Sequence, residues 1–198
     1  MTAWMYRCLI IALAFFGIAP ASRHVSDDQP GVLNVHIRDY CDPVSFAALG
    51  CDRTATPVSA GVITLSGFRA ELGADKSVGA WRFVPDRARA EEGLSLTLQN
   101  LGGETHTFTR VREFGGGFVA PLNAASGNPV PAPECARMVN GQLAPQPPSP
   151  DNIFLPGNAN ATGPLVPEGQ TAKFQCCIHP WMRMTVKAKE HQEEGNDR

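Results

Sequence analysis

The chain lacks an excess of charge of either sign. Its 198 residues carry 17 basic and 19 acidic side chains, which gives a formal net charge of −2 at pH 7. A surface that holds nucleic acid needs a clear excess of Lys and Arg, usually gathered on one face. We therefore expect no nucleic-acid partner.

Long hydrophobic runs are absent beyond the first residues. The apolar segment CLIIALAFFGIA covers residues 8–19, fewer than the roughly 18 residues that span a bilayer. Arg7 precedes this segment, and a small-x-small cleavage pattern ends at Ala21. We interpret residues 1–21 as a signal peptide, with an uncleaved anchor as the alternative. The mature chain, starting at Ser22, is then expected to be periplasmic or secreted and to have no membrane span.

The sequence also shows no long amphipathic helix, no internal repeat and no grouping of nucleophile, base and oxyanion donors. The last of these absences argues against an enzyme. Alternation of apolar and polar residues is present instead, most clearly in LSLTLQN, residues 94–100. Further segments with strand character are 61–68, 80–84, 106–111, 171–176 and 184–188. Short strands separated by turn residues predict an all-β sandwich.

Proline is distributed unevenly along the chain. Eleven of the 17 prolines lie between residues 121 and 167, which predicts a long Pro/Gly-rich loop excursion there rather than core sheet. The predicted organisation is an N-terminal extension with a disulfide loop (22–59), one β domain (60–189) that contains this insertion, and a polar tail (190–198).

Cysteine is scarce, and its number is informative. Of six cysteines, Cys8 would leave with the signal peptide, and the other five are Cys41, Cys51, Cys135, Cys176 and Cys177. An odd number in a compartment where disulfides persist leaves one thiol without a partner in the chain. That thiol pairs between molecules, stays free and reactive, or binds a metal.

Sulfur and imidazole are densest in KFQCCIHPWMRMTVKA, residues 173–188. The alternation of TAKFQC places Cys176 on the same face as Phe174, whereas Cys177 falls outside the pattern. His179 opens a tight turn that Met182 closes, so a thiolate, an imidazole and a thioether meet at one end of a strand pair. These are the soft ligands of a blue-copper site, which needs one more histidine.

His106 is the histidine in the right context. It follows a glycine-containing turn and opens the next predicted strand. The other histidines, His24, His36 and His191, lie near the termini without clustered partners. We interpret them as bystanders, although His24 with His36 is an alternative, weak surface copper site.

These segments resemble the cupredoxins, the family of small copper proteins that includes plastocyanin, pseudoazurin and amicyanin. CCIHPWMR, residues 176–183, is similar to the amicyanin-type ligand loop, and NLGGETHTF, residues 100–108, is similar to the segment that carries the first histidine. The resemblance implies a cupredoxin-like Greek-key β-sandwich, with Asn100 fixing the loop around the cysteine through backbone hydrogen bonds.

The resemblance also implies one type 1 copper ion. Its ligands would be His106, Cys176, His179 and, as the axial ligand, Met182. Met184 stays open as the alternative, because it lies at the longer His-to-Met spacing of plastocyanin.

With Cys176 as a ligand, the four other cysteines can pair in three ways. Cys41 and Cys51 can close a short loop while Cys135 pairs with Cys177. The alternative is the reverse assignment, with Cys177 as the ligand; spacing and face favour Cys176.

The expected function is that of a periplasmic one-electron carrier that cycles between Cu(I) and Cu(II). A redox protein partner would dock at an exposed edge of His179 beside Trp181. Two alternatives stay open: a copper-handling or storage protein without a redox partner, and a metal-free domain for interactions in the cell envelope.

Overall fold

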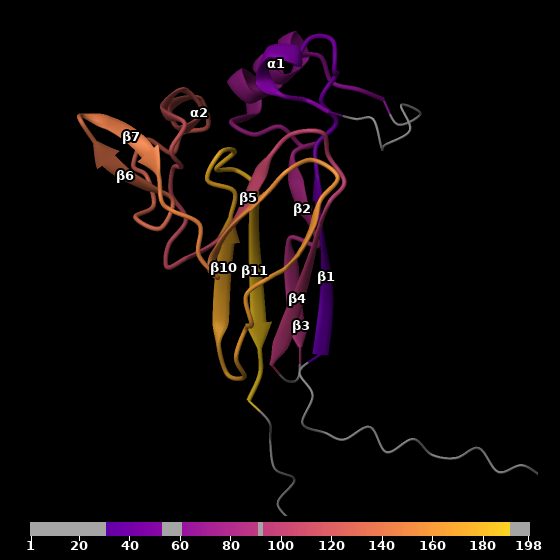
Figure 1. Ribbon diagram of the computed structural model, residues 1–198, viewed down its shortest axis with the longest axis vertical. Coiled ribbons are helices and arrows are strands. Elements are labelled where there is room, and N and C mark those ends of the chain that lie inside the picture. The colour runs from indigo at the N-terminus through magenta and orange to yellow at the C-terminus, as the bar shows by residue number, and fades with distance from the viewer. Residues whose placement is uncertain (1–30, 53–60, 91–92, 191–198) are drawn as a thin grey trace, which may run out of the picture.

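The computed structural model describes residues 31–52, 61–90 and 93–190 (Figure 1). The predicted signal peptide and cleavage site lie outside these ranges, as does the tail after residue 190. Within them, no helix is both long and apolar enough to cross a membrane.

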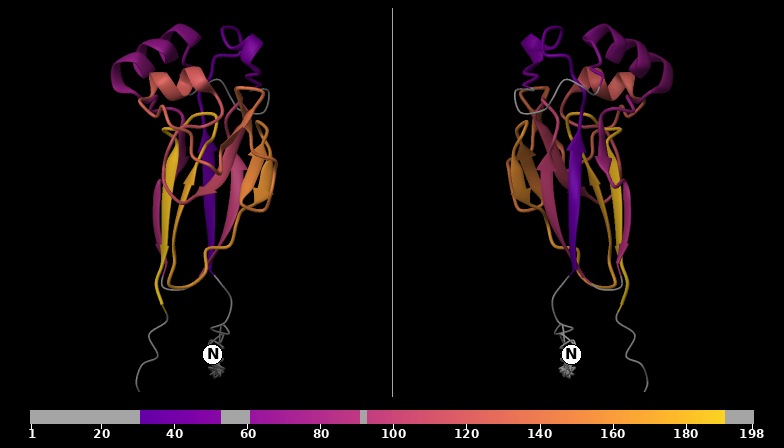
Figure 2. Two further views of the ribbon diagram at one scale, coloured as in Figure 1. Left: turned by 90° about the vertical axis from the view of Figure 1, so that its left-hand side faces the viewer. Right: turned by 90° about the vertical axis from the view of Figure 1, so that its right-hand side faces the viewer.

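Two β-sheets form the layers of a sandwich (Figures 1 and 2). One sheet has the strand order β2-β1-β4-β9, and the other has the order β3-β11-β10-β5-β8. The strands of the first sheet are β1 (Gly31–Arg38), β2 (Arg82–Val84), β4 (Leu94–Asn100) and β9 (Asn160–Thr162). Those of the second are β3 (Arg87–Ala90), β5 (His106–Val111), β8 (Asn152–Leu155), β10 (Thr171–Gln175) and β11 (Arg183–Ala188). The predicted all-β sandwich is confirmed.

The core lies between the two sheets and follows from the period of two. In β4 the alternating residues Leu94, Leu96 and Leu98 are buried. From the opposite sheet, Phe108 and Phe174 stack with ring centroids 4.5 Å apart. Each such large side chain contributes about 1.5–3 kcal/mol by its burial, so these positions hold the layers together.

Strand β1 lies inside the range 22–59, for which the sequence predicts an N-terminal extension. It pairs in parallel with β4 and antiparallel with β2, and its inward-facing Val35 and Ile37 are fully buried. This core strand was missed because its alternation is short and contains a histidine and an asparagine.

The strand expected over residues 61–68 is wrong. Only Ile63 makes a β-bridge, with Cys41, and helix α1 (Leu65–Asp75) begins two residues later. Thr64 caps the helix, its hydroxyl accepting a hydrogen bond from the Gly67 amide. Phe68 and Leu72, four residues apart, are the buried residues of the helix. Capping and i,i+4 burial therefore outweigh the β propensity of the preceding GVIT.

The Pro-rich range 121–167 contains more regular structure than expected. It includes most of helix α2 (Ala120–Ala125) and a separate hairpin made of β6 (Ala136–Val139) and β7 (Gln142–Pro145). It also contains β8 and β9, which are edge strands of the two main sheets. The prediction of a loop is wrong for these two strands. They have only four and three residues, and prolines next to short edge strands are tolerated because few ladder amides are needed there.

Helices α1 and α2 and the short helix η1 (Ala47–Leu49) lie together at one end of the sandwich (Figure 2). Beneath them an aromatic cluster forms from Phe46, Phe68 and Trp81, with ring centroids 4.8–5.7 Å apart. This end of the molecule carries the crowded cysteine and histidine segment.

Candidate metal centre

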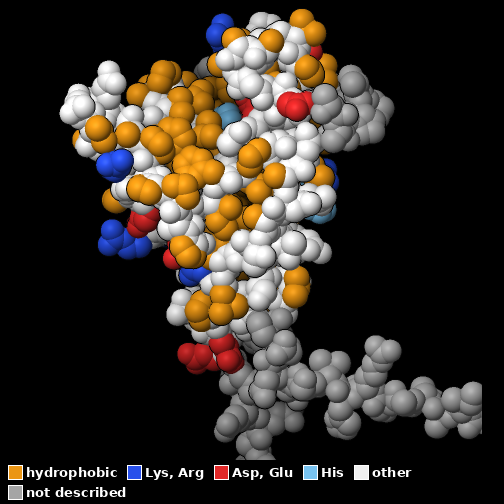
Figure 3. Space-filling model, viewed as in Figure 1, with side chains coloured by type: hydrophobic (Ala, Val, Ile, Leu, Met, Phe, Trp, Pro, Cys, Tyr) orange, Lys and Arg blue, Asp and Glu red, His pale blue; other side chains and the backbone are white. Residues whose placement is uncertain are grey.

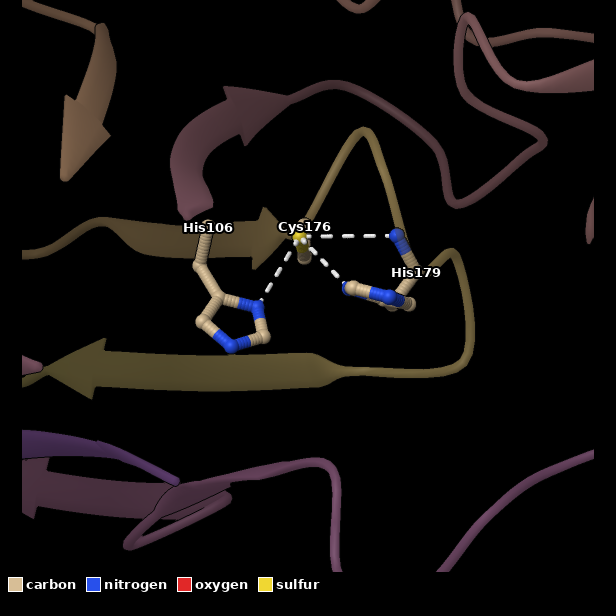
Figure 4. A group of neighbouring side chains, drawn as sticks. All are labelled: His106, Cys176 and His179. Atoms are coloured by element: carbon tan, nitrogen blue, oxygen red, sulfur yellow. Dashed lines mark hydrogen bonds between the residues drawn. The ribbon is translucent and has the colours of Figure 1, made fainter. Parts of the chain in front are cut away.

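Three side chains from two distant parts of the sequence converge at the end of the sandwich where α1 and α2 lie, the capped end (Figure 4). His106 is the first residue of β5, Cys176 directly follows β10, and His179 lies in the turn between β10 and β11. The Cys176 sulfur is 3.7 Å from Nδ1 of His106 and 3.9 Å from Nδ1 of His179. Cys176 and His106 are fully buried, and His179 is 4% exposed.

The spacing of these donor atoms fits a bound metal ion. A metal about 2.3 Å from sulfur and about 2.0 Å from nitrogen, at bond angles of about 110–120°, separates the two donors by about 3.5–3.7 Å. The observed distances of 3.7 and 3.9 Å are close to that range. Thiolate and imidazole donors suit copper and zinc, whereas magnesium and calcium prefer oxygen.

The surroundings of Cys176 favour a thiolate over a thiol. Burial raises the pKa of Cys176, but hydrogen bonds and charge interactions with His106 and His179 outweigh it and hold that pKa well below its ordinary value. Burial also opposes a charge on His106, yet hydrogen bonds to Asp39 and Cys176 raise the pKa of this imidazole to about 10. Cys176 is thus held as a thiolate, the form of cysteine that binds metals.

Backbone amides fix the position of the sulfur. The Thr107 and His179 amides point at the Cys176 sulfur, at 3.4 and 3.5 Å. The Thr107 hydroxyl accepts a hydrogen bond of 2.7 Å from the Cys177 amide, which ties β5 to the loop of residues 176–182. Sequence reasoning missed Thr107, although its place directly after His106 was a usable signal.

Asn100 does not have the predicted role. Its side-chain amide donates to the carbonyls of Glu104, Leu155 and Pro156, and its oxygen accepts from Gly102. Asn100 therefore ties its own turn to the end of β8, while Thr107 fastens the loop around the cysteine.

Met182 and Met184 are both buried, and they differ in their distance from Cys176 along the β10–β11 strand pair. The Cys176 amide donates to the Met182 carbonyl, so these two residues lie opposite each other. Met184 is paired with Phe174, one step further into the core. Directly opposite side chains are about 4.5–5.5 Å apart at Cβ, whereas diagonal neighbours are about 7–8 Å apart. Met182 is thus the methionine closer to the sulfur in register.

The disulfides match the pairing that the sequence favoured. Cys41 pairs with Cys51 and Cys135 with Cys177, which leaves Cys176 as the free cysteine in the part of the chain that the structure describes. Adjacent residues of an extended chain point to opposite sides, so Cys176 faces the core while Cys177 faces the loop that carries Cys135.

His179 is not an exposed docking edge, which corrects that expectation. Its ring contacts Phe68, Trp81 and Trp181, with centroid distances of 6.4, 6.4 and 5.4 Å. Helix α1, which carries Phe68, was not foreseen, so the cover over the histidine was not foreseen either. On the face seen in Figure 3, apolar side chains gather toward this end of the molecule.

Two buried carboxylates lie behind the imidazoles, and neither was identified from the sequence. Asp39 Oδ2 is 2.9 Å from His106 Nε2. Glu104 Oε2 accepts a 2.6 Å hydrogen bond from the Trp81 indole and lies 3.7 Å from His179 Nε2. The sequence contained two signals for them. Asp39 directly follows the segment that forms β1, and Glu104 lies two residues before His106.

Of the remaining histidines, His36 lies within the described ranges, and it does not join the cluster. His36 lies in β1, where it is half-buried and paired in register with Val84 and Gln99. His24 and His191 lie outside the described ranges, so the alternative surface site stays a prediction.

We expect Gly117→Ala to destabilise the protein and disturb the ligand loop. A Cβ at this position would lie 1.7 Å from the Cys177 carbonyl oxygen, whereas a Cβ at Gly73 in α1 meets nothing within 4 Å. Overpacking of this kind costs about 1–3 kcal/mol, and Gly73→Ala should instead stabilise by about 0.5–1 kcal/mol. Thermal unfolding of both variants checks this, and equal melting temperatures would contradict it.

Comparisons with known proteins give only distant likenesses. No known family profile matches the chain, and no curated protein matches it. Among solved structures, it is similar to a novel purple cupredoxin from Nitrosopumilus maritimus (13% identity, 78% of this chain and 97% of that one, TM-score 0.35). It is also similar to a mutant plastocyanin of fern (15% identity, 79% of this chain and 100% of that one, TM-score 0.35). A further similar structure is oxidised plastocyanin from Dryopteris crassirhizoma (17% identity, 79% of this chain and 100% of that one, TM-score 0.29). Because these scores are low, the function has to be inferred from His106, Cys176 and His179 themselves.

Proposed function

We propose that this chain is a type 1 copper protein in which His106, Cys176 and His179 bind one copper ion and Met182 is the axial ligand. The observation that carries the proposal is the buried convergence of two imidazole Nδ1 atoms on a cysteine that no disulfide uses. Such a ligand set, completed by a weak axial thioether, is that of a blue-copper site.

Copper held by these ligands would supply one-electron exchange between Cu(II) and Cu(I). The protein residues keep the donors in place in both states: β5, β10 and β11 fix them, and the amides of Thr107 and His179 hold the sulfur. Burial of all three ligands excludes water from the site. Little rearrangement is then needed when an electron arrives or leaves, which suits electron transfer better than catalysis of a substrate reaction.

We further propose that the protein works as an electron carrier outside the cytoplasm, after removal of residues 1–21. The two disulfides of the described residues agree with an oxidising compartment. Because His179 is covered, an electron exchanged with a redox partner at the capped end would have to pass Phe68, Trp81 or Trp181.

The same cover over His179 favours a second function, copper handling without a redox partner. An electron carrier benefits when the edge of a metal ligand reaches the protein surface. A storage protein benefits when its metal site is enclosed. Both functions require the thiolate site, so they differ in the rate of electron exchange and not in the ligands.

Copper loading tests the proposal. The purified mature protein is titrated with Cu(II) and followed by visible absorption, and an intense blue band at one equivalent is expected. Reversible voltammetry of the loaded protein supports a carrier, and blue protein without a reversible wave supports copper handling. A colourless protein at saturating copper would contradict both.

The axial ligand gives a paired prediction. We expect Met182→Leu to keep copper bound and to raise the reduction potential, because the change removes a weak donor that favours Cu(II). Met184→Leu, one register step away beside Phe174, is the control and should leave the potential near that of the wild type. Voltammetry of both variants decides, and a shift confined to Met184→Leu would place the axial ligand two residues later.

A further inference from the structure

Asp39 lies one residue beyond the end of β1 and is almost fully buried. Its carboxylate accepts hydrogen bonds from the backbone amides of Cys41, Gly103 and Glu104 at 3.0–3.3 Å. Its Oδ2 atom is also 2.9 Å from Nε2 of His106. Both oxygens are therefore used, and one of them is directed at the far side of a proposed metal ligand.

We propose, on the basis of the proposed copper site, that Asp39 is a positioning residue for that site. It holds His106 by Nε2 so that Nδ1 faces the metal, and its negative charge favours Cu(II) over Cu(I).

The hydrogen bond decides which ring nitrogen can bind the metal. In the neutral imidazole that binds a metal, a carboxylate next to Nε2 requires that this nitrogen carry the proton, which leaves the lone pair on Nδ1. Nδ1 is the atom that lies 3.7 Å from the Cys176 sulfur. Asp39 thereby sets both the tautomer and the rotation of the ring.

The carboxylate can do this because it is itself held rigidly. Three backbone amides fix it, and the Cys41–Cys51 disulfide begins two residues after it. Gly102 gives it room, since a Cβ there would lie 1.9 Å from Asp39 Oδ2. A glycine turn, a disulfide loop and a strand end therefore converge on one side chain.

Asp39 also supplies a negative charge next to His106. Its carboxylate accepts hydrogen bonds from the backbone amides of Cys41, Gly103 and Glu104, and several N–H donors on one carboxylate favour its ionised form. Asp39 is therefore the carboxylate that stays ionised beside the imidazole, and a nearby negative charge stabilises the more positive metal state.

The test compares Asp39→Asn with Asp42→Asn in the full mature protein. Asp42 caps a turn three residues away, through the amides of Val44 and Ser45, so its variant makes the same chemical change outside the site. Asp39→Asn should weaken Cu(II) binding about 10- to 100-fold, the usual effect of losing such a partner, and should raise the reduction potential. Asp42→Asn should change neither. Equal affinity and equal potential in the two variants would overturn the proposal.

A measurement on the unaltered protein keeps the test decisive if Asp39→Asn fails to fold. In Zn(II)-loaded wild-type protein, ¹⁵N NMR should show His106 protonated on Nε2, with slow exchange of that proton. A proton on Nδ1, or rapid exchange at Nε2, would overturn the role of Asp39. This readout does not depend on blue colour, so it distinguishes failure of this inference from failure of the copper proposal.

Discussion

Cys176→Ser should be colourless at any copper concentration. The blue colour of a type 1 site comes from charge transfer between the cysteine sulfur and copper, and a hydroxyl cannot replace the soft anionic donor. Cys176 is the free cysteine of the described residues and touches both imidazoles, so no other thiolate there can take its place. The expected result is complete loss of the blue band, together with much weaker copper binding. Absorption and paramagnetic resonance spectra of copper-treated variants measure it.

Its matched control is Cys177→Ser, which makes the same replacement of sulfur by oxygen in the adjacent residue. Cys177 is bonded to Cys135 and faces away from the imidazoles. This variant should therefore keep the blue band. If Cys176→Ser stays blue and Cys177→Ser does not, the ligand and disulfide roles are the reverse of those proposed.

Removal of the Cys135–Cys177 disulfide should have the largest effect on stability. The bond joins residues 42 apart in the sequence, whereas Cys41 and Cys51 are 10 apart. Chain-entropy arithmetic gives about 4 kcal/mol for the longer loop and about 2.7 kcal/mol for the shorter one. The double variant Cys135→Ser/Cys177→Ser should thus lose more unfolding free energy than Cys41→Ser/Cys51→Ser.

Denaturant unfolding of the metal-free proteins measures both losses, because bound copper would add its own stabilisation. The longer disulfide also fastens the Pro-rich segment to the residue next to Cys176. Its loss should leave the protein blue when folded, while lowering the midpoint of unfolding. A larger loss from the Cys41–Cys51 pair would contradict the loop-length argument.

The sequence alone determined the features that depend on local pattern. The period of two in LSLTLQN predicted β4, and the alternation of TAKFQC separated the inward Cys176 from Cys177. The odd cysteine number required a thiol with another use, and His179 and Met182 are close because the turn is short. Such features can be predicted because neighbours in the chain are neighbours in space.

Only the tertiary structure decided what surrounds those residues. Asp39 reaches His106 across 67 positions, and Phe68 of α1 covers His179 from more than 100 positions away. No periodicity encodes such contacts, since they depend on how two sheets and a helix pack together. Helix α1 itself required the Thr64 cap and a buried face to overcome strand propensity. Local spacing thus places Cys176, His179 and Met182 close together, whereas the approach of His106, the burial of the cluster and the charge behind His106 come from packing between distant segments.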